Sequence, residues 1–241
     1  MKNFILTVLF GLNAIGVFGQ SYWQHFDTSD GLISNTIKSA VLESPTSIYL
    51  GSPNGLTHYD QGTFTNYTIS NSGLNSNNIL NLKLGSSYLY LHTDSGLTTF
   101  DGSNFVNYTI NNGLPSNDIK EIQLSSNGTL WIGTTSGVAS FDGVQFTQYP
   151  NKVAHALGID SSDRVYIITK STIIGNETAN NLQVFNRNQW IGYTLNDPLG
   201  NLILDKPNFK LLENGTLIIS AINTPFYSIS NLVIPTAPFS K

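Results

Sequence analysis

Apolar and polar residues alternate in short runs along this chain, and most runs end at a turn signal. The clearest stretch is residues 113–149. There, Ile119–Leu124 alternates as a half-buried strand does, and three further runs follow at Thr129–Gly133, Val138–Phe141 and Gln145–Tyr149. Asn-Gly and Asp-Gly pairs, which favour tight hairpin turns, lie between them. The pattern predicts four short antiparallel strands, and no segment after residue 19 has a convincing helical period.

This unit of four predicted strands repeats along the chain. Asp60, Asp101 and Asp142 are separated by steps of 41 residues. Three other residue types keep the same step: Gly55, Gly96, Gly137, Phe64, Phe105, Phe146, Tyr67, Tyr108 and Tyr149. Four antiparallel strands in about 41 residues is the size of a β-propeller blade. We therefore expect an all-β fold, a β-propeller, most simply with five four-stranded blades.

The last two blades follow the repeat less closely. Blade four matches it from Phe185 to Tyr193, with an insertion around Gly175–Asn181. Blade five retains Asn214–Ile219 and is expected to continue with a third strand at Thr224–Ile229. The glycine-leucine connector of the earlier blades is replaced in these two by Val153–Leu157 and Pro198–Leu202.

The predicted ring needs a closing strand. Trp23–Phe26 resembles Phe146–Tyr149, the fourth strand of a blade, yet it precedes the first blade. Because an open strand edge favours aggregation, we expect this N-terminal strand to join the last blade and close the ring. Two alternatives stay open: Asn231–Ile234 fills that position, or another chain completes a larger ring.

The N-terminal residues are typical of an export signal. Lys2 precedes an apolar run from Phe4 to Leu12, and Gly19 ends a small-residue cleavage pattern. We expect a signal peptide at 1–19, a single β-propeller domain at 20–241, and no membrane span after cleavage. The expected location is secreted or periplasmic. The chain has no cysteine, so disulfides cannot contribute to its stability.

Composition narrows the range of partners. Only 11% of residues are charged, the net charge is −4, and no basic run exists that could neutralise a phosphate backbone, so we expect no nucleic acid partner. The four histidines, His25, His58, His92 and His155, form no spaced pair typical of a metal site. No phosphate-binding glycine loop precedes a helix. We predict neither a metal nor another cofactor.

A connector motif, GLxSNxI, is present at 31–37, 73–79 and 113–119. Together with NGTLWIGT, SGV and FDG in 113–149, it resembles the two-component regulator propeller repeat. The resemblance is clear over roughly residues 31–149 and implies a β-propeller. It further implies a binding or interaction module, since propellers of that family form periplasmic sensor halves of histidine kinases or parts of secreted proteins.

The connector motif has two interpretations. In the first, its Ser-Asn pairs bond to nearby backbone, its glycines adopt positive φ, and Leu32, Leu74 and Leu114 pack between blades. In the second, the motif is a repeated ligand contact. The structural interpretation is favoured, because the motif recurs in phase with the hairpins.

Recognition is expected on the face that carries the connectors and the turns between second and third strands. These turns differ from blade to blade, and varied loops on a rigid frame commonly bind ligands. Tyr90 and His92 depart from the repeat and join the candidates. The candidate ligand-binding residues are Asn35, Asn54, Asn77, Tyr90, His92, Asp94, Asn117 and Thr135.

The functional hypothesis is an exported, non-catalytic propeller that binds a glycan or a protein ligand. A glycan-active hydrolase or lyase is the first alternative, since glycosidases need two carboxylates about 5–9 Å apart. The acids in or near predicted first strands are Glu43, Asp118, Glu121, Asp160 and Glu213. A structural component of a cell-surface complex is the second alternative. The sequence predicts no catalytic residue and no oligomeric state.

Overall fold

The computed structural model describes residues 7–9, 23–154, 156–174, 177–186, 189–195, 208–211, 217–220 and 232–234. In this part of the chain, strands dominate, and the one helical element is the 3₁₀ turn η1 (Ile110–Asn112). The expected all-β class is therefore confirmed. No helix in the described part is long and apolar enough to cross a membrane.

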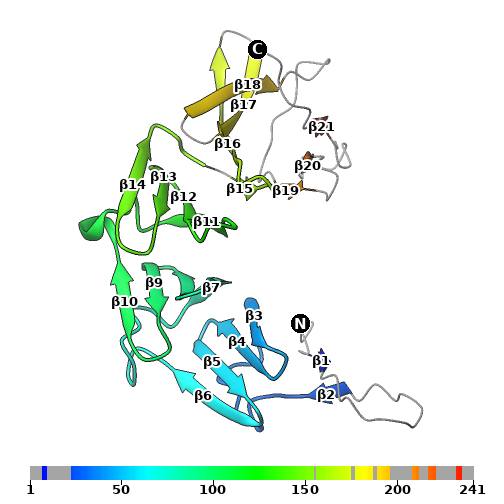
Figure 1. Cartoon of the computed structure of the whole chain (residues 1–241), viewed down its shortest axis with the longest axis vertical. Coiled ribbons are helices and arrows are strands. Elements are labelled where there is room, and N and C mark those ends of the chain that lie inside the picture. Colours follow the sequence, from blue (N-terminus) through cyan, green and yellow to red (C-terminus); the bar gives the residue numbers. More distant parts are fainter. Residues whose placement is uncertain are drawn as a thin grey trace. The chain divides into compact units, whose positions relative to one another are not determined.

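The strands form consecutive antiparallel sheets, labelled in Figure 1. The first sheet is β3 (Ser39–Ser44), β4 (Ser47–Ser52), β5 (Gly55–Asp60) and β6 (Thr63–Tyr67). The second is β7 (Ile79–Leu84), β8 (Leu89–Thr93), β9 (Gly96–Phe100) and β10 (Phe105–Tyr108). The third is β11 (Ile119–Leu124), β12 (Leu130–Thr134), β13 (Gly137–Phe141) and β14 (Phe146–Pro150). The strands predicted in 113–149 are thus confirmed to within one residue.

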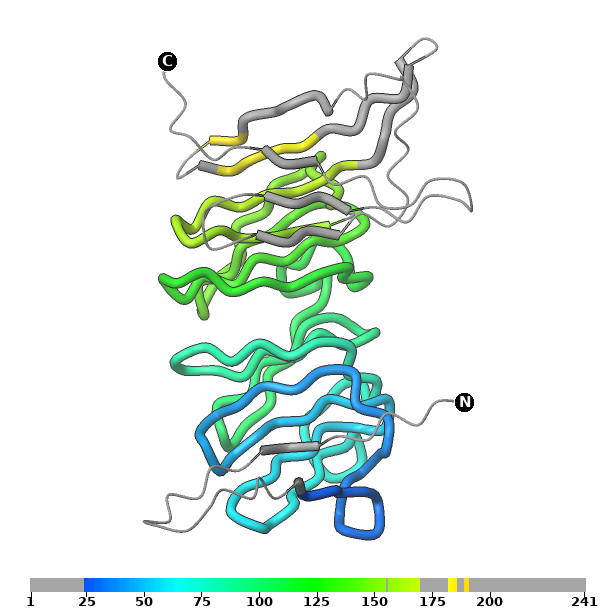
Figure 2. Tube along the Cα trace, turned by 90° about the vertical axis from the view of Figure 1, so that its right-hand side faces the viewer, coloured from blue at the N-terminus to red at the C-terminus, as the bar shows by residue number. Residues whose placement is uncertain are grey.

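Two later sheets follow. The fourth is β15 (Ala156–Ile159), β16 (Val165–Ile174), β17 (Glu177–Asn186) and β18 (Gln189–Leu195). The fifth has three described strands, β19 (Asn208–Leu211), β20 (Leu217–Ser220) and β21 (Leu232–Ile234). Figure 2 traces the chain from one sheet to the next. The first two sheets belong to one compact unit, Met1–Thr109, and the other three to a second, Ile110–Lys241.

A repeated aromatic pair sets the register of the outer hairpins. Phe100 lies opposite Phe105 with ring centroids 4.2 Å apart, and Phe141 lies opposite Phe146 at 4.5 Å. Such cross-strand pairs are a principal source of sheet stability. At the turn between the paired strands, the Asp101 carboxylate accepts the backbone N–H groups of Ser103 and Asn104. The predicted role of the repeated aspartates as turn formers is confirmed at this position.

In the first unit, consecutive sheets pack face to face through a shared apolar core. Tyr49 and Leu56 of the first sheet join Leu82, Leu91 and Phe100 of the second in one cluster. The connector residue Leu74 is 5% exposed and belongs to the same cluster, so its predicted packing between blades is confirmed. We call such a contact between consecutive sheets a joint.

The second unit contains an equivalent joint between its third and fourth sheets. Trp131 and Val138 of the third sheet cluster with Val165 and Ile167 of the fourth, and Trp190 packs against them. Tyr49 and Trp131 are two repeat steps apart, and each packs into a joint from the second strand of its sheet. Both side chains are buried, since Tyr49 is 5% exposed and Trp131 is 6% exposed.

The insertion in blade four lengthens a hairpin. β16 and β17 have ten residues each, against five or six for the second and third strands of the first three sheets. Their pairing has an irregularity between Thr169 and Thr172 and continues to Ile174 and Glu177. The extra residues therefore extend the second and third strands, and the predicted tip residues 175–176 lie outside the described ones.

The chain ends leave two expectations untested. β2 (Trp23–His25) pairs with β1 (Thr7–Leu9), in the register Val8 opposite Gln24, and its predicted pairing with the last blade stays a prediction. In the fifth sheet, β21 pairs directly with β20. Since β20 pairs with β19 on its other side, the third strand of this sheet is β21 and not the predicted 224–229. The connector replacement, 198–202, lies outside the described residues.

Candidate functional site

The serine and asparagine of the connector motif bond to backbone in the same way in all three copies. Each serine Oγ accepts the N–H of the residue two positions later, at 3.0–3.1 Å; the serines are Ser34, Ser76 and Ser116. Each asparagine Oδ1 accepts a backbone N–H seven or eight residues upstream, at 2.8–2.9 Å; the pairs are Asn35–Thr28, Asn77–Ile69 and Asn117–Ile110. Both side chains therefore hold the loop in shape.

The motif glycine is also held in a repeated way. Its carbonyl accepts a side-chain amide from the fourth strand of the following sheet, at 2.8–2.9 Å; the pairs are Asn66–Gly31, Asn107–Gly73 and Gln148–Gly113. Gly113 has φ +110°, and an added Cβ would lie 3.2 Å from the Phe146 ring. A side chain at this position would be strained by both the backbone angle and the contact.

These contacts confirm the structural interpretation of the connector, except that positive φ is found at Gly31 and Gly113 and not at Gly73. Asn35 is exposed and Asn77 and Asn117 are half-buried, so each retains an amide NH₂ near the surface while its Oδ1 is used in the loop. Their role as ligand contacts stays a prediction.

The turns between second and third strands share a frame and differ at the tip. A hydroxyl at the end of the second strand donates to the glycine carbonyl across the turn and accepts a turn N–H; the residues are Ser52, Thr93 and Thr134. The predicted site residues Asn54, Asp94 and Thr135 lie in these turns and are exposed. The frame is constant and the exposed chemistry is variable, as the sequence predicted.

In the first unit, one of these turns is joined to the connector by a polar network, which we call the Asp94 network. Asp94 accepts hydrogen bonds from Ser76 Oγ at 2.5 Å and Asn78 Nδ2 at 3.0 Å. Lys38, which directly precedes β3, donates from Nζ to Asn78 Oδ1 at 2.7 Å. The hydrogen bond from Ser76, then that from Asn78, lowers the pKa of Asp94. The network thus joins one carboxylate, one amide and one ammonium group at the surface. The spacing of these residues gave no signal for it, because Lys38 is 40 residues from Asn78.

Two predicted site residues are placed differently. Tyr90 is 4% exposed and His92 is 5% exposed, both on β8. The structure therefore separates them from the exposed turn residues with which the sequence grouped them. The prediction that Tyr90 departs from the repeat was wrong, because Tyr90 occupies the same repeat position as Tyr49 and Trp131, which fill joints.

A second polar cluster, which the sequence did not single out, lies on the first sheet. Ser47 Oγ lies 2.7 Å from Glu43 Oε2 and 2.7 Å from His58 Nε2, and the His58 ring stacks on Tyr49 at 4.1 Å. Burial, followed by the nearby Glu43 charge, raises the pKa of the Tyr49 hydroxyl to about 12. The sequence offered one signal for this cluster: the second and third blades lack the serine and the histidine at the positions equivalent to Ser47 and His58.

This cluster does not have the geometry of a catalytic triad. In such a triad the acid contacts the imidazole nitrogen opposite the one that faces the serine. Here Glu43 Oε2 approaches the same Nε2 as Ser47, at 3.2 Å. Ser47 is also 4% exposed. The arrangement is that of a hydrogen-bonded turn between β3 and β4, and it does not present a nucleophile.

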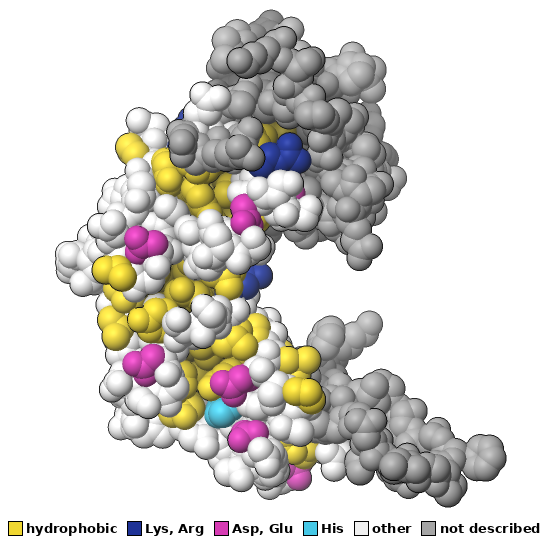
Figure 3. All heavy atoms as spheres, viewed as in Figure 1, with side chains coloured by type: hydrophobic (Ala, Val, Ile, Leu, Met, Phe, Trp, Pro, Cys, Tyr) yellow, Lys and Arg dark blue, Asp and Glu magenta, His cyan; other side chains and the backbone are white. Residues whose placement is uncertain are grey.

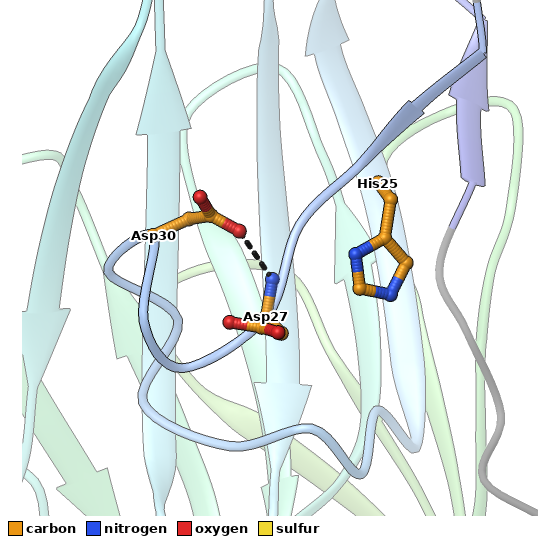
Figure 4. A group of neighbouring side chains, drawn as sticks. All are labelled: His25, Asp27 and Asp30. Carbon is orange, nitrogen blue, oxygen red and sulfur yellow. Dashed lines mark hydrogen bonds between the residues drawn. The ribbon is translucent and has the colours of Figure 1, made fainter.

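Three potential metal ligands meet before the first sheet (Figure 4). His25, Asp27 and Asp30 have ligand atoms within 4.8 Å of one another. Both carboxylates already accept hydrogen bonds within the loop. Asp30 accepts the N–H of Asp27 at 2.8 Å, and Asp27 accepts both the N–H and the hydroxyl of Ser29. The hydroxyl bond from Ser29 is the main cause of the lowered pKa of Asp27. These bonds account for the group without an ion.

Two acids proposed for the hydrolase alternative have structural partners. Asp160 is 7% exposed and accepts Arg164 Nε at 2.6 Å and the Tyr166 hydroxyl at 2.9 Å. Asp118 forms an ion pair with Lys120 at 2.9 Å. Glu213 lies outside the described residues. Figure 3 shows sparse charged side chains among hydrophobic and neutral polar ones on the visible face of the described part.

Comparison with known families identifies the repeat. The model for the two component regulator propeller matches residues 113–136, which comprise the third connector, β11, β12 and the turn after it. Residues 113–136 are a two component regulator propeller repeat. The resemblance drawn from the sequence is therefore confirmed. No curated protein sequence matches the chain.

Solved structures share the fold of this chain. The extracellular domain of BT4673 from B. thetaiotaomicron, described as a hybrid two component system, has a TM-score of 0.56 and 17% identity over 86% of this chain and 29% of its own. BT3049, a second such system from the same organism, has a TM-score of 0.52 and 18% identity over 82% of this chain and 34% of its own.

A third structure with the same fold is PorZ, a surface component of the type-IX secretion system of Porphyromonas gingivalis. Its TM-score is 0.54, with 13% identity over 81% of this chain and 28% of its own. The chain thus spans about a third of the length of each of these three relatives. At these identities the likeness shows the fold, and the predicted β-propeller class is confirmed.

Proposed function

We propose that this chain is an extracytoplasmic β-propeller module that binds a glycan or protein ligand through its connectors and second-to-third strand turns, without catalysing a reaction. The observation that carries the proposal is the contrast within the repeat. The backbone contacts of Ser34, Ser76 and Ser116 are constant, whereas the residue after the second strand varies and is Pro53, Asp94 or Thr135. A rigid frame that presents varied loops is a common design of binding proteins.

The location rests on two supports. Residues 1–19 have the pattern of an export signal. The structures with a similar fold described above include extracellular domains and a bacterial surface component. Export would place the propeller outside the cytoplasm, where it can meet extracellular ligands. The compared domains of two component systems are also extracellular.

Among ligand classes, a neutral glycan is favoured by the chemistry of the Asp94 network. Lys38 and Asp94 carry opposite formal charges, and Asn78 bridges them through both ends of its amide. Carboxylate, amide and ammonium groups offer acceptors and donors to sugar hydroxyls, and their charges balance. A polyanionic or strongly cationic ligand gains less from such a surface.

The test is a glycan array with the full chain, expressed with its own leader and purified from the extracytoplasmic fraction. Binding to at least one neutral glycan is expected, and Asp94→Asn and Asn78→Ala are expected to weaken it. Asp101→Asn is the matched control, because it makes the same charge change in a hairpin at the other end of the second sheet.

The outcomes separate the possibilities. Equal binding by wild type, Asp94→Asn and Asp101→Asn would remove the network from the site. If the chain binds no glycan and instead captures a defined protein partner, the glycan assignment is contradicted and a protein ligand is favoured. Release of shortened sugars from a bound glycan would contradict the non-catalytic assignment.

A further inference from the structure

Three Asn-Gly pairs lie in the described part of the chain, at 54–55, 112–113 and 127–128. Asparagine before glycine is prone to lose its side-chain amide, because the glycine nitrogen can attack the asparagine carbonyl carbon without hindrance from a Cβ. All three asparagines are exposed. The pairs differ in how firmly the fold holds the glycine, and this difference decides which asparagine can react.

Two of the three glycines are held in place. Gly55 is buried and pairs with Ser52 in the β4–β5 ladder. Its carbonyl accepts the Ser52 hydroxyl at 2.8 Å, and a Cβ added to it would clash with the Tyr67 carbonyl oxygen. The carbonyl of Gly113 accepts the Gln148 amide at 2.9 Å. The nitrogen of neither glycine can swing towards the preceding side chain without disturbing these contacts.

Gly128 is the least restrained of the three. Apart from its chain neighbours, no atom lies within 4 Å of the position that a Cβ would occupy. One backbone bond, from the Gly128 N–H to the Ser125 carbonyl at 3.0 Å, must break before the nitrogen can react. In the same turn, Asn127 Oδ1 accepts the Thr129 N–H at 2.9 Å. That bond polarises the side-chain carbonyl and stabilises negative charge on its oxygen, so it favours attack at Asn127 Cγ.

We propose that Asn127 is a site of spontaneous deamidation, and that the carboxylate formed there weakens the contact between the third and fourth sheets. The Gly128 nitrogen gives up its proton to solvent and bonds to Asn127 Cγ, the Cγ–Nδ2 bond breaks, and ammonia leaves. Water then opens the five-membered imide at either carbonyl, which gives aspartate or isoaspartate. The net reaction consumes one water and releases one ammonia, with no oxidation or reduction.

The turn that carries Asn127 is bound to the fourth sheet through one carboxylate. Asp163, in the turn between β15 and β16, accepts the Ser126 N–H at 2.7 Å and the Ser126 Oγ at 2.6 Å. The Ser126 hydroxyl is the main cause of the lowered pKa of Asp163, and the backbone of Asn127 also contributes. A carboxylate at position 127 therefore adds a like charge beside Asp163. The isoaspartate product also lengthens the backbone, which displaces these N–H groups.

The first test follows deamidation in the full chain, expressed with its own leader and purified after export. Samples kept at mildly alkaline pH and physiological temperature are digested, and mass spectrometry distinguishes amide from acid at each asparagine. Acid should accumulate several-fold faster at Asn127 than at Asn54 or Asn112. In the urea-unfolded chain the three sites should convert at similar rates, because no glycine is held there.

Three results would overturn the assignment of the site. They are conversion at Asn54 or Asn112 that equals or exceeds conversion at Asn127, no conversion at Asn127, and the same order of rates in the unfolded chain as in the folded one.

The second test measures the effect of the new charge on stability. Asn127→Asp should lower the melting temperature, whereas Asn151→Asp, the same change at an exposed residue of the second unit, should leave it nearly unchanged. With Asp163→Asn in place, the loss caused by Asn127→Asp should largely disappear, because the repelling charge is gone. Equal melting temperatures for Asn127→Asp and Asn151→Asp, or an equal loss with and without Asp163→Asn, would contradict the proposed weakening of this contact.

Discussion

The amide that holds the connector glycine allows a quantitative test of how the blades are tied together. In the second sheet, Asn107 Nδ2 donates to the Gly73 carbonyl at 2.8 Å, and Asn107 Oδ1 accepts the Thr98 hydroxyl at 2.7 Å. In the third sheet, Gln148 Nε2 donates to the Gly113 carbonyl at 2.9 Å, and alanine occupies the position equivalent to Thr98. Asn107 therefore makes two bonds where Gln148 makes one.

The expected costs follow from this difference. A typical intramolecular hydrogen bond contributes about 0.5–1.5 kcal/mol net. Asn107→Ala removes two bonds and should lower the free energy of unfolding by about 1–2 kcal/mol. This value is near the low end for two bonds, because the buried Thr98 hydroxyl can still donate to Asn75 Oδ1 at 3.2 Å. Gln148→Ala should cost about 0.5–1 kcal/mol, since one partly solvated bond is lost.

Urea unfolding followed by far-ultraviolet circular dichroism measures both values, provided that the slope with denaturant stays constant among the variants. A double-mutant cycle with Thr98→Val isolates the Thr98–Asn107 bond, and a coupling energy of about 0.5–1 kcal/mol is expected. The reasoning fails if Asn107→Ala costs no more than Gln148→Ala, or if the coupling energy is indistinguishable from zero.

Two further predictions concern the second unit. Gly113→Ala should destabilise the chain more than Gly128→Ala: both glycines have positive φ, but an added Cβ meets the Phe146 ring only at Gly113, and thermal unfolding of both variants checks the order. Asp163 accepts the N–H and the hydroxyl of Ser126, and the hydroxyl bond is the main cause of its lowered pKa. Because the folded-state pKa of Asp163 is lowered, its ionised carboxylate stabilises the fold at neutral pH, and this stabilisation is lost as the pH falls through that pKa. The difference in melting temperature between wild type and Asp163→Asn should therefore shrink in acid. A difference that stays constant down to pH 2 would contradict this role.

Local signals were sufficient for the strands and turns of the first three sheets. The step of 41 residues, the alternation in 119–124 and the Asn-Gly and Asp-Gly pairs each act over a few neighbouring residues, so they could be read without tertiary contacts. The blade-four insertion was located correctly, but its form was not foreseen. An insertion can enter a loop or lengthen two strands, and pairing between β16 and β17 decides which.

The candidate site was predicted unevenly for a similar reason. The exposed turn residues Asn54, Asp94 and Thr135 follow from their position in hairpins. Burial of Tyr90 and His92 does not, because it depends on what packs against β8. The Asp94 network and the Glu43–Ser47–His58 cluster join residues on different strands or sheets, and no spacing rule in one sequence specifies such contacts.

The repeat, the all-β class, the strand boundaries in 113–149 and the structural role of the GLxSN connector could be read from the amino-acid sequence, because they depend on short-range patterns repeated in phase. The hydrogen-bond partners and the burial of the repeated side chains could be seen only in the tertiary structure. It showed that Asn35, Asn77 and Asn117 hold loops through Oδ1, that Asp94 reaches Lys38 through Asn78, and that Tyr90 and His92 are buried. The physical reason is that hydrogen-bond partners and burial are set by the packing of whole sheets, which brings together residues 40 or more positions apart.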